Sequence, residues 1–454
     1  MSKGRIIGGI AIAAVIGAAI AAFAVIWRPA IAAIEPPTAQ SFEPALVKRG
    51  RDLAAIGNCN DCHTVRAAGK AYAGGLPVPT PFGTIYSSNI TPDPDTGIGR
   101  WSEAAFQRAM RSGVDRGGHH LYPTFPYDHF TNVTDDDDRA LYAFLMTRPA
   151  VHAPTPANNL AFPFNQRFVV AGWKLLFLHP GAYQADPAKG AEWNRGAYLV
   201  EGLAHCGACH TPRNALGAER SAASFSGGDV ENWQAYAINA NSPAPLPWDA
   251  EALYRYLRQG FDPDHGVARG PMAEVVSNLS AVPENDVHAI AVYTSSVFGA
   301  PTAERLRRAN ETRAQLKSPL ARPAGSDNSG ASIYAAACAP CHDSGRPPPY
   351  GGVNLALSTS LSASDPRNAA NIILAGIRPV AGERSPIMPP FADSMTDAQI
   401  SAVLTYLRSR SGNHTAWSNV EQTVRDARRG EAAFLQTSRA PANAPADSTQ
   451  RDKP

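Results

Sequence analysis

The pentapeptide CNDCH at residues 59–63 is the first of three copies of one motif, which recurs as CGACH at 206–210 and as CAPCH at 338–342. The spacing Cys-x-x-Cys-His is that of c-type haem attachment, because two thiols add to the haem vinyl groups and the next histidine reaches the iron. A zinc or redox site would explain one such motif, but not three that use every cysteine of the chain. We therefore predict three covalently attached haem c groups. The attachment residues would be Cys59, Cys62, Cys206, Cys209, Cys338 and Cys341.

The composition limits the remaining function classes. The 454 residues carry a formal net charge of +2, and no basic patch with interleaved aromatic residues indicates nucleic acid as a partner. The sequence contains no Rossmann fingerprint, no Ser/His/Asp set and no flavin motif. We therefore expect a chain that transfers electrons and has neither catalytic residues nor a substrate site of its own.

The N-terminus predicts export across the cytoplasmic membrane. Lys3 and Arg5 precede residues 6–27, which carry no charge and are long enough to span a bilayer. The small residues AIAA at 30–33 allow a cleaved signal peptide as the alternative. However, the apolar stretch is longer than the apolar region of a usual signal peptide. We predict an uncleaved anchor over residues 1–28. The haem domains would then face the periplasm of a bacterium, because c-type haem is attached outside the cytoplasm.

The chain repeats by domain. Each unit begins with an apolar helical segment before its motif and ends with an amphipathic helix that has acidic residues near its start, where they suit the helix dipole. These patterns predict three all-helical domains at 45–150, 186–300 and 326–412. Between the first two, FVVAGWKLLFL predicts an interdomain helix, with a membrane-surface or partner-facing segment as the alternative. Residues 430–454 lack a packable pattern and predict a disordered tail.

The axial ligands of the three irons follow in part from the motifs. The proximal ligands would be His63, His210 and His342. Methionine or histidine usually completes such a site, and methionine raises the reduction potential. Met272 stands beside Pro271 in the second domain, and Met388 stands beside Pro389 in the third. Proline gives a rigid loop that can hold a thioether against iron, so we predict these two methionines as sixth ligands.

The first domain lacks a methionine at the matching place. Phe125 follows Cys59 by 66 residues, as Met272 follows Cys206. The spacing to the aromatic residue of the closing helix gives the same alignment. Phenylalanine cannot bind iron, so another residue must complete this site or leave it open.

We predict His129 as the sixth ligand of the first haem. His119, His120, Met110 and a five-coordinate iron are the alternatives. Two imidazoles would give this haem a lower potential than its neighbours. A five-coordinate iron would instead bind small ligands.

The chain resembles the tri-haem cytochrome c subunits of membrane-associated bacterial dehydrogenases. The resemblance covers roughly residues 44–425 and is carried by five stretches: NCNDCHT, LYPTFPY, NRGAYLVEGLAHCGACHTPRNALGA, GPMAEVVSNLSAVPENDVHAIAVY and MPPFADSMTDAQISAVLTYLRSRSG. It implies an all-α fold of three tandem class I cytochrome c domains with an N-terminal transmembrane helix. It also implies that the haems relay electrons from a catalytic dehydrogenase subunit to ubiquinone or a terminal oxidase.

Within that family, LYPTFPY followed by YDHF is more similar to the branch paired with molybdenum hydroxylases, which act on aldehydes or N-heterocycles. The alternative partners are a quinoprotein alcohol dehydrogenase and a flavin-dependent gluconate dehydrogenase. Two other function classes stay open. One is a haem enzyme with peroxidase-like activity at the first haem, and the other is the cytochrome component of an oxidase complex.

Overall fold

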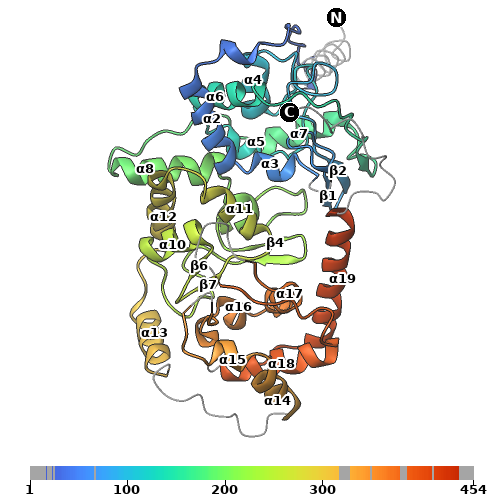
Figure 1. The fold of residues 1–454 in the computed structure, drawn as a ribbon. Coiled ribbons are helices and arrows are strands. Elements are labelled where there is room, and N and C mark those ends of the chain that lie inside the picture. The colour runs from blue at the N-terminus through green and yellow to red at the C-terminus, as the bar shows by residue number, and fades with distance from the viewer. Residues whose placement is uncertain are drawn as a thin grey trace, which may run out of the picture.

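The computed structural model describes residues 17, 23, 26–65, 68–315, 328–347, 350–378, 386–411 and 414–438. The three haem motifs lie on short helices that follow one another along the molecule (Figure 1). These helices are α3 (Cys59–Cys62), α9 (Gly207–His210) and α15 (Ala339–His342).

A pair of long helices frames each motif. Helix α2 (Pro44–Ile56) packs against α6 (Asp135–Met146), α8 (Ala191–Tyr198) against α12 (Glu284–Phe298), and α14 (Asn328–Ala337) against α18 (Asp397–Arg410). The closing helices begin as the acidic pattern predicts. The Thr134 side chain accepts from the Asp137 amide, and Thr396 forms a capping box with Gln399.

Each helix pair crosses at a glycine. A Cβ on this residue would overlap a backbone carbonyl oxygen of the closing helix, so no larger residue allows the two helices to approach so closely. The same Cβ would also touch an aromatic residue one turn further along that helix. The three sets of glycine, carbonyl and aromatic ring are Gly50, Ala140 and Phe144; Gly196, Ala289 and Tyr293; and Gly330, Ala402 and Tyr406.

A third helix in each domain precedes the sixth-ligand position along the chain. These helices are α4 (Glu103–Ser112), α10 (Ala250–Gln259) and α17 (Arg367–Ala375). Each ends at a glycine with positive φ: 57° at Gly113, 72° at Gly260 and 67° at Gly376. Positive φ favours glycine and stops a helix sharply. The loops that follow lead into α5 (Tyr127–Phe130), into α11 (Pro271–Leu279), and into the turn before α18.

Short strands correct the all-α prediction. Strands β1 (Pro77–Thr80), β2 (Gly83–Tyr86) and β3 (Asn159–Leu160) form an antiparallel sheet. Two hairpins pair β4 (Gly228–Val230) with β5 (Trp233–Ala235), and β6 (Phe261–Asp262) with β7 (Gly266–Val267). Strands of two to four residues are too short to show an alternating pattern, so the sequence contains no signal for them.

The predicted N-terminal transmembrane helix is also corrected. Most of residues 6–27 lie outside the described residues, and within the described ranges no helix is both long and apolar enough to cross a membrane. The apolar linker forms α7 (Arg167–Phe177), which is a helix as predicted. Its 11 residues fall well short of the roughly 20 that a bilayer requires.

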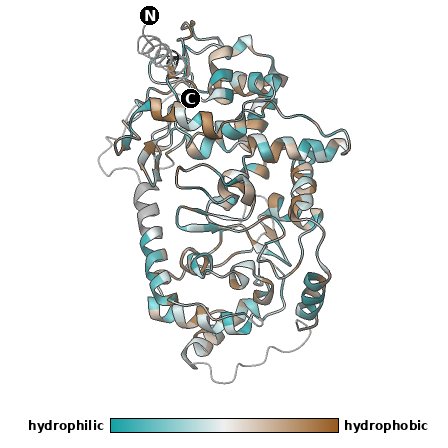
Figure 2. Ribbon diagram, turned by 180° about the vertical axis from the view of Figure 1, so that it is seen from behind, coloured by the Kyte–Doolittle hydropathy of each residue, from teal (hydrophilic) through white to brown (hydrophobic). Residues whose placement is uncertain are grey.

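The remaining helices include two in the C-terminal part of the chain and five short ones. Helix α13 (Ala303–Gln315) lies in the charged linker and is mostly hydrophilic (Figure 2). Helix α19 (Val420–Ser438) packs on α17 and α18, and it includes the first residues of the predicted tail, of which 439–454 lie outside the described residues. The shorter helices are α16 (Thr359–Ser362), η1 (Ala39–Ser41), η3 (Leu199–Leu203), η4 (Ser221–Ala223) and η5 (Leu355–Leu357).

The glycine crossing predicts the effect of a single methyl group. In Gly196→Ala, the new Cβ overlaps the Ala289 carbonyl oxygen, so α8 and α12 must move apart. We expect the free energy of unfolding to fall by about 2 kcal/mol, measured as a lower midpoint in thermal circular dichroism. Gly172→Ala on α7 is the control, because nothing lies within 4 Å of its Cβ. An equal loss in both variants would contradict the close crossing.

Candidate haem sites

Each predicted proximal histidine is held by a backbone carbonyl. The Nδ1 of His63 lies 2.6 Å from the Ser88 oxygen, that of His210 lies 2.6 Å from the Tyr236 oxygen, and that of His342 lies 2.9 Å from the Val353 oxygen. A carbonyl can only accept, so Nδ1 carries the proton and Nε2 is left for iron. Burial lowers the pKa of His63 and of His210, which keeps both imidazoles in the neutral form that binds metal.

Burial keeps two of the cysteines in the thiol form. It raises the pKa of Cys59 and of Cys206 to about 12, so both are protonated at neutral pH. These two thiols are therefore poor nucleophiles, because the thiolate is the reactive form.

One continuous cavity joins the second and third motifs. Its lining is largely apolar and aromatic, which suits a large flat macrocycle. Both predicted methionine ligands face this cavity together with the histidine of their own domain. The motif and methionine residues in its lining are Cys206, Cys209, His210, Met272, Cys338, His342 and Met388. The residues present therefore fit haem at these two sites.

The sixth-ligand position has the same spacing in all three domains. It follows the glycine that ends the third helix by twelve residues, from Gly113 to Phe125, from Gly260 to Met272 and from Gly376 to Met388. The turn after this glycine is shared by the first two domains. The Leu121 amide donates to the Gly113 oxygen at 2.7 Å, and the Ala268 amide donates to the Gly260 oxygen at 2.8 Å. The backbone at the position itself differs, because Phe125 lies in a bend, Met272 is the second residue of α11, and Met388 pairs with Ile377 in an isolated bridge.

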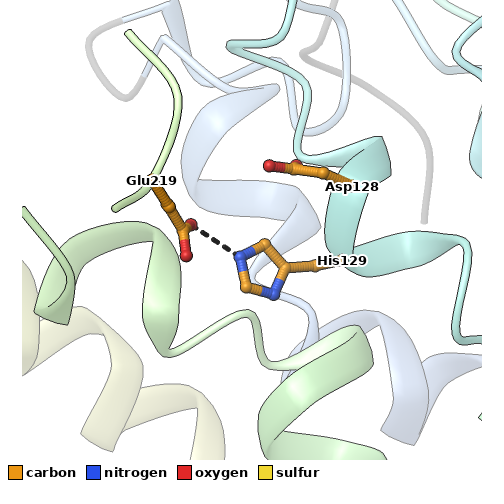
Figure 3. Close-up of side chains that lie close together, drawn as sticks. All are labelled: Asp128, His129 and Glu219. Atoms are coloured by element: carbon orange, nitrogen blue, oxygen red, sulfur yellow. Dashed lines mark hydrogen bonds and ion pairs between the residues drawn. The ribbon is translucent and has the colours of Figure 1, made fainter. Parts of the chain in front are cut away.

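The two ring nitrogens of His129 contact the second domain. Nδ1 lies 2.9 Å from the Glu201 backbone oxygen, and Nε2 lies 2.7 Å from Oε1 of Glu219 (Figure 3). Burial alone would lower the pKa of His129, but the Glu219 carboxylate outweighs it and raises the pKa to about 9. A protonated imidazole with both nitrogens engaged offers no lone pair to iron. The assignment of His129 to the first haem stays a prediction, and this geometry does not support it.

The other histidine candidates are engaged too. Nε2 of His120 lies 2.9 Å from the Ile26 backbone oxygen, and its Nδ1 lies 3.1 Å from Nζ of Lys174. His119 is largely exposed, and its Nδ1 lies 3.0 Å from an Asp115 carboxylate oxygen. Met110 is buried among the apolar residues of the first domain.

Asp128, His129 and Glu219 form a cluster between the first two domains. Their ligand atoms all lie within 4.8 Å of one another, and the cluster lies beside the second motif, where a Cβ on Gly207 would sit 3.0 Å from the His129 ring. Burial raises the pKa of Asp128, and its Oδ1 has no hydrogen-bond partner among the described residues. The His129–Glu219 pair was not foreseen from the sequence, because its members are 90 residues apart.

Further contacts place the second motif between the other two. The Asn278 side chain, on the second-domain helix α11, donates to Asn58 Oδ1 and to Asp61 Oδ2, both at 2.8 Å. Burial raises the pKa of Cys62 to about 11, and the nearby Asp61 and Cys209 contribute to this rise. The first and second motifs are thus neighbours, and the second and third share a cavity. Electrons could therefore pass along the chain through the middle site.

The His129–Glu219 pair predicts a pH-dependent contact between the first two domains. The pKa of His129 is raised from 6.5 to about 9, so its stabilisation is complete below pH 6.5 and is lost as the pH rises through about 9. Glu219→Gln should remove stabilisation on the order of 3 kcal/mol and flatten the pH dependence. Thermal unfolding of both proteins between pH 6 and pH 10 measures this. Parallel pH curves would contradict the ion pair.

Comparison with known proteins shows the family of the chain. Residues 47–149 match the family model described as cytochrome c, and residues 325–407 match cytochrome c oxidase, cbb3-type, subunit III. The chain is 46% identical to a nicotinate dehydrogenase subunit of Pseudomonas putida over 90% of its own length, but it spans only 34% of that protein.

Two further relatives match over most of both chains. The fructose dehydrogenase cytochrome subunit of Gluconobacter japonicus is 36% identical, with 84% of this chain and 82% of the relative covered. The gluconate 2-dehydrogenase cytochrome c subunit of Pantoea cypripedii is 35% identical, with coverage of 85% and 90%. The chain therefore belongs to the family of cytochrome c subunits of dehydrogenases, whose domains carry covalently bound haem c.

Proposed function

We propose that the chain carries one haem c at each of its three motifs and conducts electrons through them in series. As a cytochrome c subunit of a dehydrogenase complex, it takes electrons from a partner dehydrogenase. The observation that carries the serial order is the central place of the second motif. It shares a cavity with the third motif and is joined to the first through Asn278.

The proposed partner is a dehydrogenase of the molybdenum hydroxylase type that acts on an aldehyde or an N-heterocycle. Two observations support this choice over a quinoprotein or flavin enzyme. The identity to a nicotinate dehydrogenase subunit is 46%, against 36% and 35% to the fructose and gluconate dehydrogenase subunits. The sequence LYPTFPYDHF is more similar to the branch paired with molybdenum hydroxylases.

The proposed electron acceptor is ubiquinone or a terminal oxidase. We place the haem domains on the periplasmic side of the bacterial cytoplasmic membrane, because c-type haem is attached outside the cytoplasm. Met272 and Met388 as sixth ligands would give the second and third haems the higher potentials that favour delivery to such acceptors.

Serial conduction predicts the result of removing the middle haem. Cys206→Ala with Cys209→Ala should leave the other two haems in place but without a carrier between them. When the partner dehydrogenase and its substrate are added, only the haem on the entry side should be reduced within one turnover time. Rapid-mixing absorption spectroscopy of the complex measures this.

The matched control removes a terminal haem through Cys338→Ala with Cys341→Ala. The two remaining haems should then still exchange electrons with each other, whether electrons normally enter the chain at the first or at the third haem. Full reduction of both outer haems without the middle one would contradict the serial order.

The partner proposal predicts which substrate reduces the haems. The chain is purified together with its partner dehydrogenase, and the complex is analysed for metals and cofactors. We expect molybdenum in the complex and rapid haem reduction on addition of an aldehyde or of nicotinate. Reduction by ethanol or gluconate, with a quinone or flavin cofactor and no molybdenum, would identify the alternative partners instead.

A further inference from the structure

We propose that the haem held by His63 has no sixth ligand from the protein, and that its iron is an open binding site for small neutral ligands such as carbon monoxide. This inference rests on the proposed function, because it requires haem at the first motif. It adds a ligand-binding site to a chain whose proposed role is conduction alone.

The residue at the sixth-ligand position of the first domain cannot bind iron. Phe125 follows Gly113 by the same twelve residues that separate Met272 from Gly260 and Met388 from Gly376. The carbon ring of phenylalanine has no atom that can donate an electron pair to iron. The interval to the site is therefore kept, while the residue at its end cannot act as a ligand.

Phe125 is also fixed in place by other aromatic rings. Its ring centroid lies 5.3 Å from that of Phe130 and 6.3 Å from that of Tyr127, both in edge-to-face geometry. Phe130 and Tyr127 are themselves buried. Such aromatic pairs add stability beyond the area that they bury. The loop is thus held by apolar packing where the other domains would use an iron–sulfur bond.

The three histidines named above as candidate ligands are engaged elsewhere. Both nitrogens of His129 contact oxygens of the second domain, and both nitrogens of His120 have partners at 2.9 and 3.1 Å. His119 extends into solvent beside Asp115. To reach the iron, His129 would have to leave the Glu219 carboxylate, which would leave that buried charge without its partner.

Met110 occupies a position that is distinct from the ligand position. It lies three residues before Gly113 on α4, and the residues three before Gly260 and Gly376 are Leu257 and Ile373. Leu257 and Ile373 both line the shared cavity, where Met272 and Met388 face the same space. The position of Met110 is therefore that of a cavity wall, and the other two domains place their methionine ligand elsewhere.

The resulting site has the chemistry of a ligand-binding haem. His63 offers Nε2 to iron because its Nδ1 is bound to the Ser88 oxygen, and Phe125 stands at the sequence position that would supply the second ligand. An iron with one strong axial ligand is high-spin in the ferric state and binds an external ligand in the open position. Because Phe125 cannot donate a hydrogen bond, the site favours a neutral ligand such as carbon monoxide over a polar one.

The test uses spectroscopy of the full chain with its haems. In the oxidised protein, we expect a high-spin signal from one haem in three by electron paramagnetic resonance. After reduction with dithionite, one carbon monoxide per chain should bind. Phe125→Met should abolish both results and add a methionine–iron charge-transfer band. A wild-type protein that is wholly low-spin and binds no carbon monoxide would overturn the inference.

Two further variants separate this site from the alternatives. His129→Ala should leave the high-spin fraction unchanged, whereas a ligand role would be shown by a new high-spin haem. Met272→Phe is the matched control, because it places the same residue at the same position of the second domain. It should add a second high-spin haem and a second carbon monoxide.

The haem content shows whether the open-site inference alone has failed or the proposed function has failed as well. A pyridine haemochrome assay that gives three haems, all low-spin, would sink only the open-site inference. The proposed function would be overturned as well if the wild-type protein held fewer than three haems and the double variant Cys59→Ala, Cys62→Ala lost no further haem.

Discussion

The hydrogen bond from each proximal histidine to a backbone carbonyl constrains the rest of the structure. An imidazole that offers Nε2 to iron must have Nδ1 fixed by the protein, and the partner must come from a loop that returns to the motif. In the first domain this loop contains β2, which ends two residues before the Ser88 carbonyl. In the second domain β5 ends one residue before Tyr236. Strands β2 and β5 therefore lead directly to the acceptor, whereas Val353 in the third domain lies outside the assigned strands.

The sequence was sufficient where a feature depends on residues close together. The motifs, the closing helices with their acidic first turns, and the phenylalanine at the sixth-ligand position are all local patterns. The strands are too short to show a period, and the acceptors Ser88, Tyr236 and Val353 use backbone oxygens that any residue would supply. Contacts between domains, such as His129 with Glu219, join positions with no pattern in common. For this reason a histidine near the first motif was assigned to iron, although it contacts the second domain in the structure.

Side-chain amides join the domains around the haem sites. Asn278 bridges the second domain to Asn58 and Asp61, and Asn368 pairs with both backbone groups of Gln234 at 2.8 and 2.9 Å. An amide both donates and accepts, so it satisfies polar groups on two domains without adding net charge beside an iron. Charge near an iron shifts its reduction potential. The amide contacts therefore join the domains without adding a charge of their own.

The glycine-ended helix and its fixed interval to the sixth-ligand position make each domain a separate unit. Within one chain, the same interval leads to a methionine twice and to a phenylalanine once, and the helix pairs cross at glycine in every case. A substitution at this position lies within one domain and leaves the corresponding residues of the other two unchanged. Evolution can therefore adjust the redox centres of such a chain one at a time, and a repeated scaffold can acquire unequal centres without a new fold.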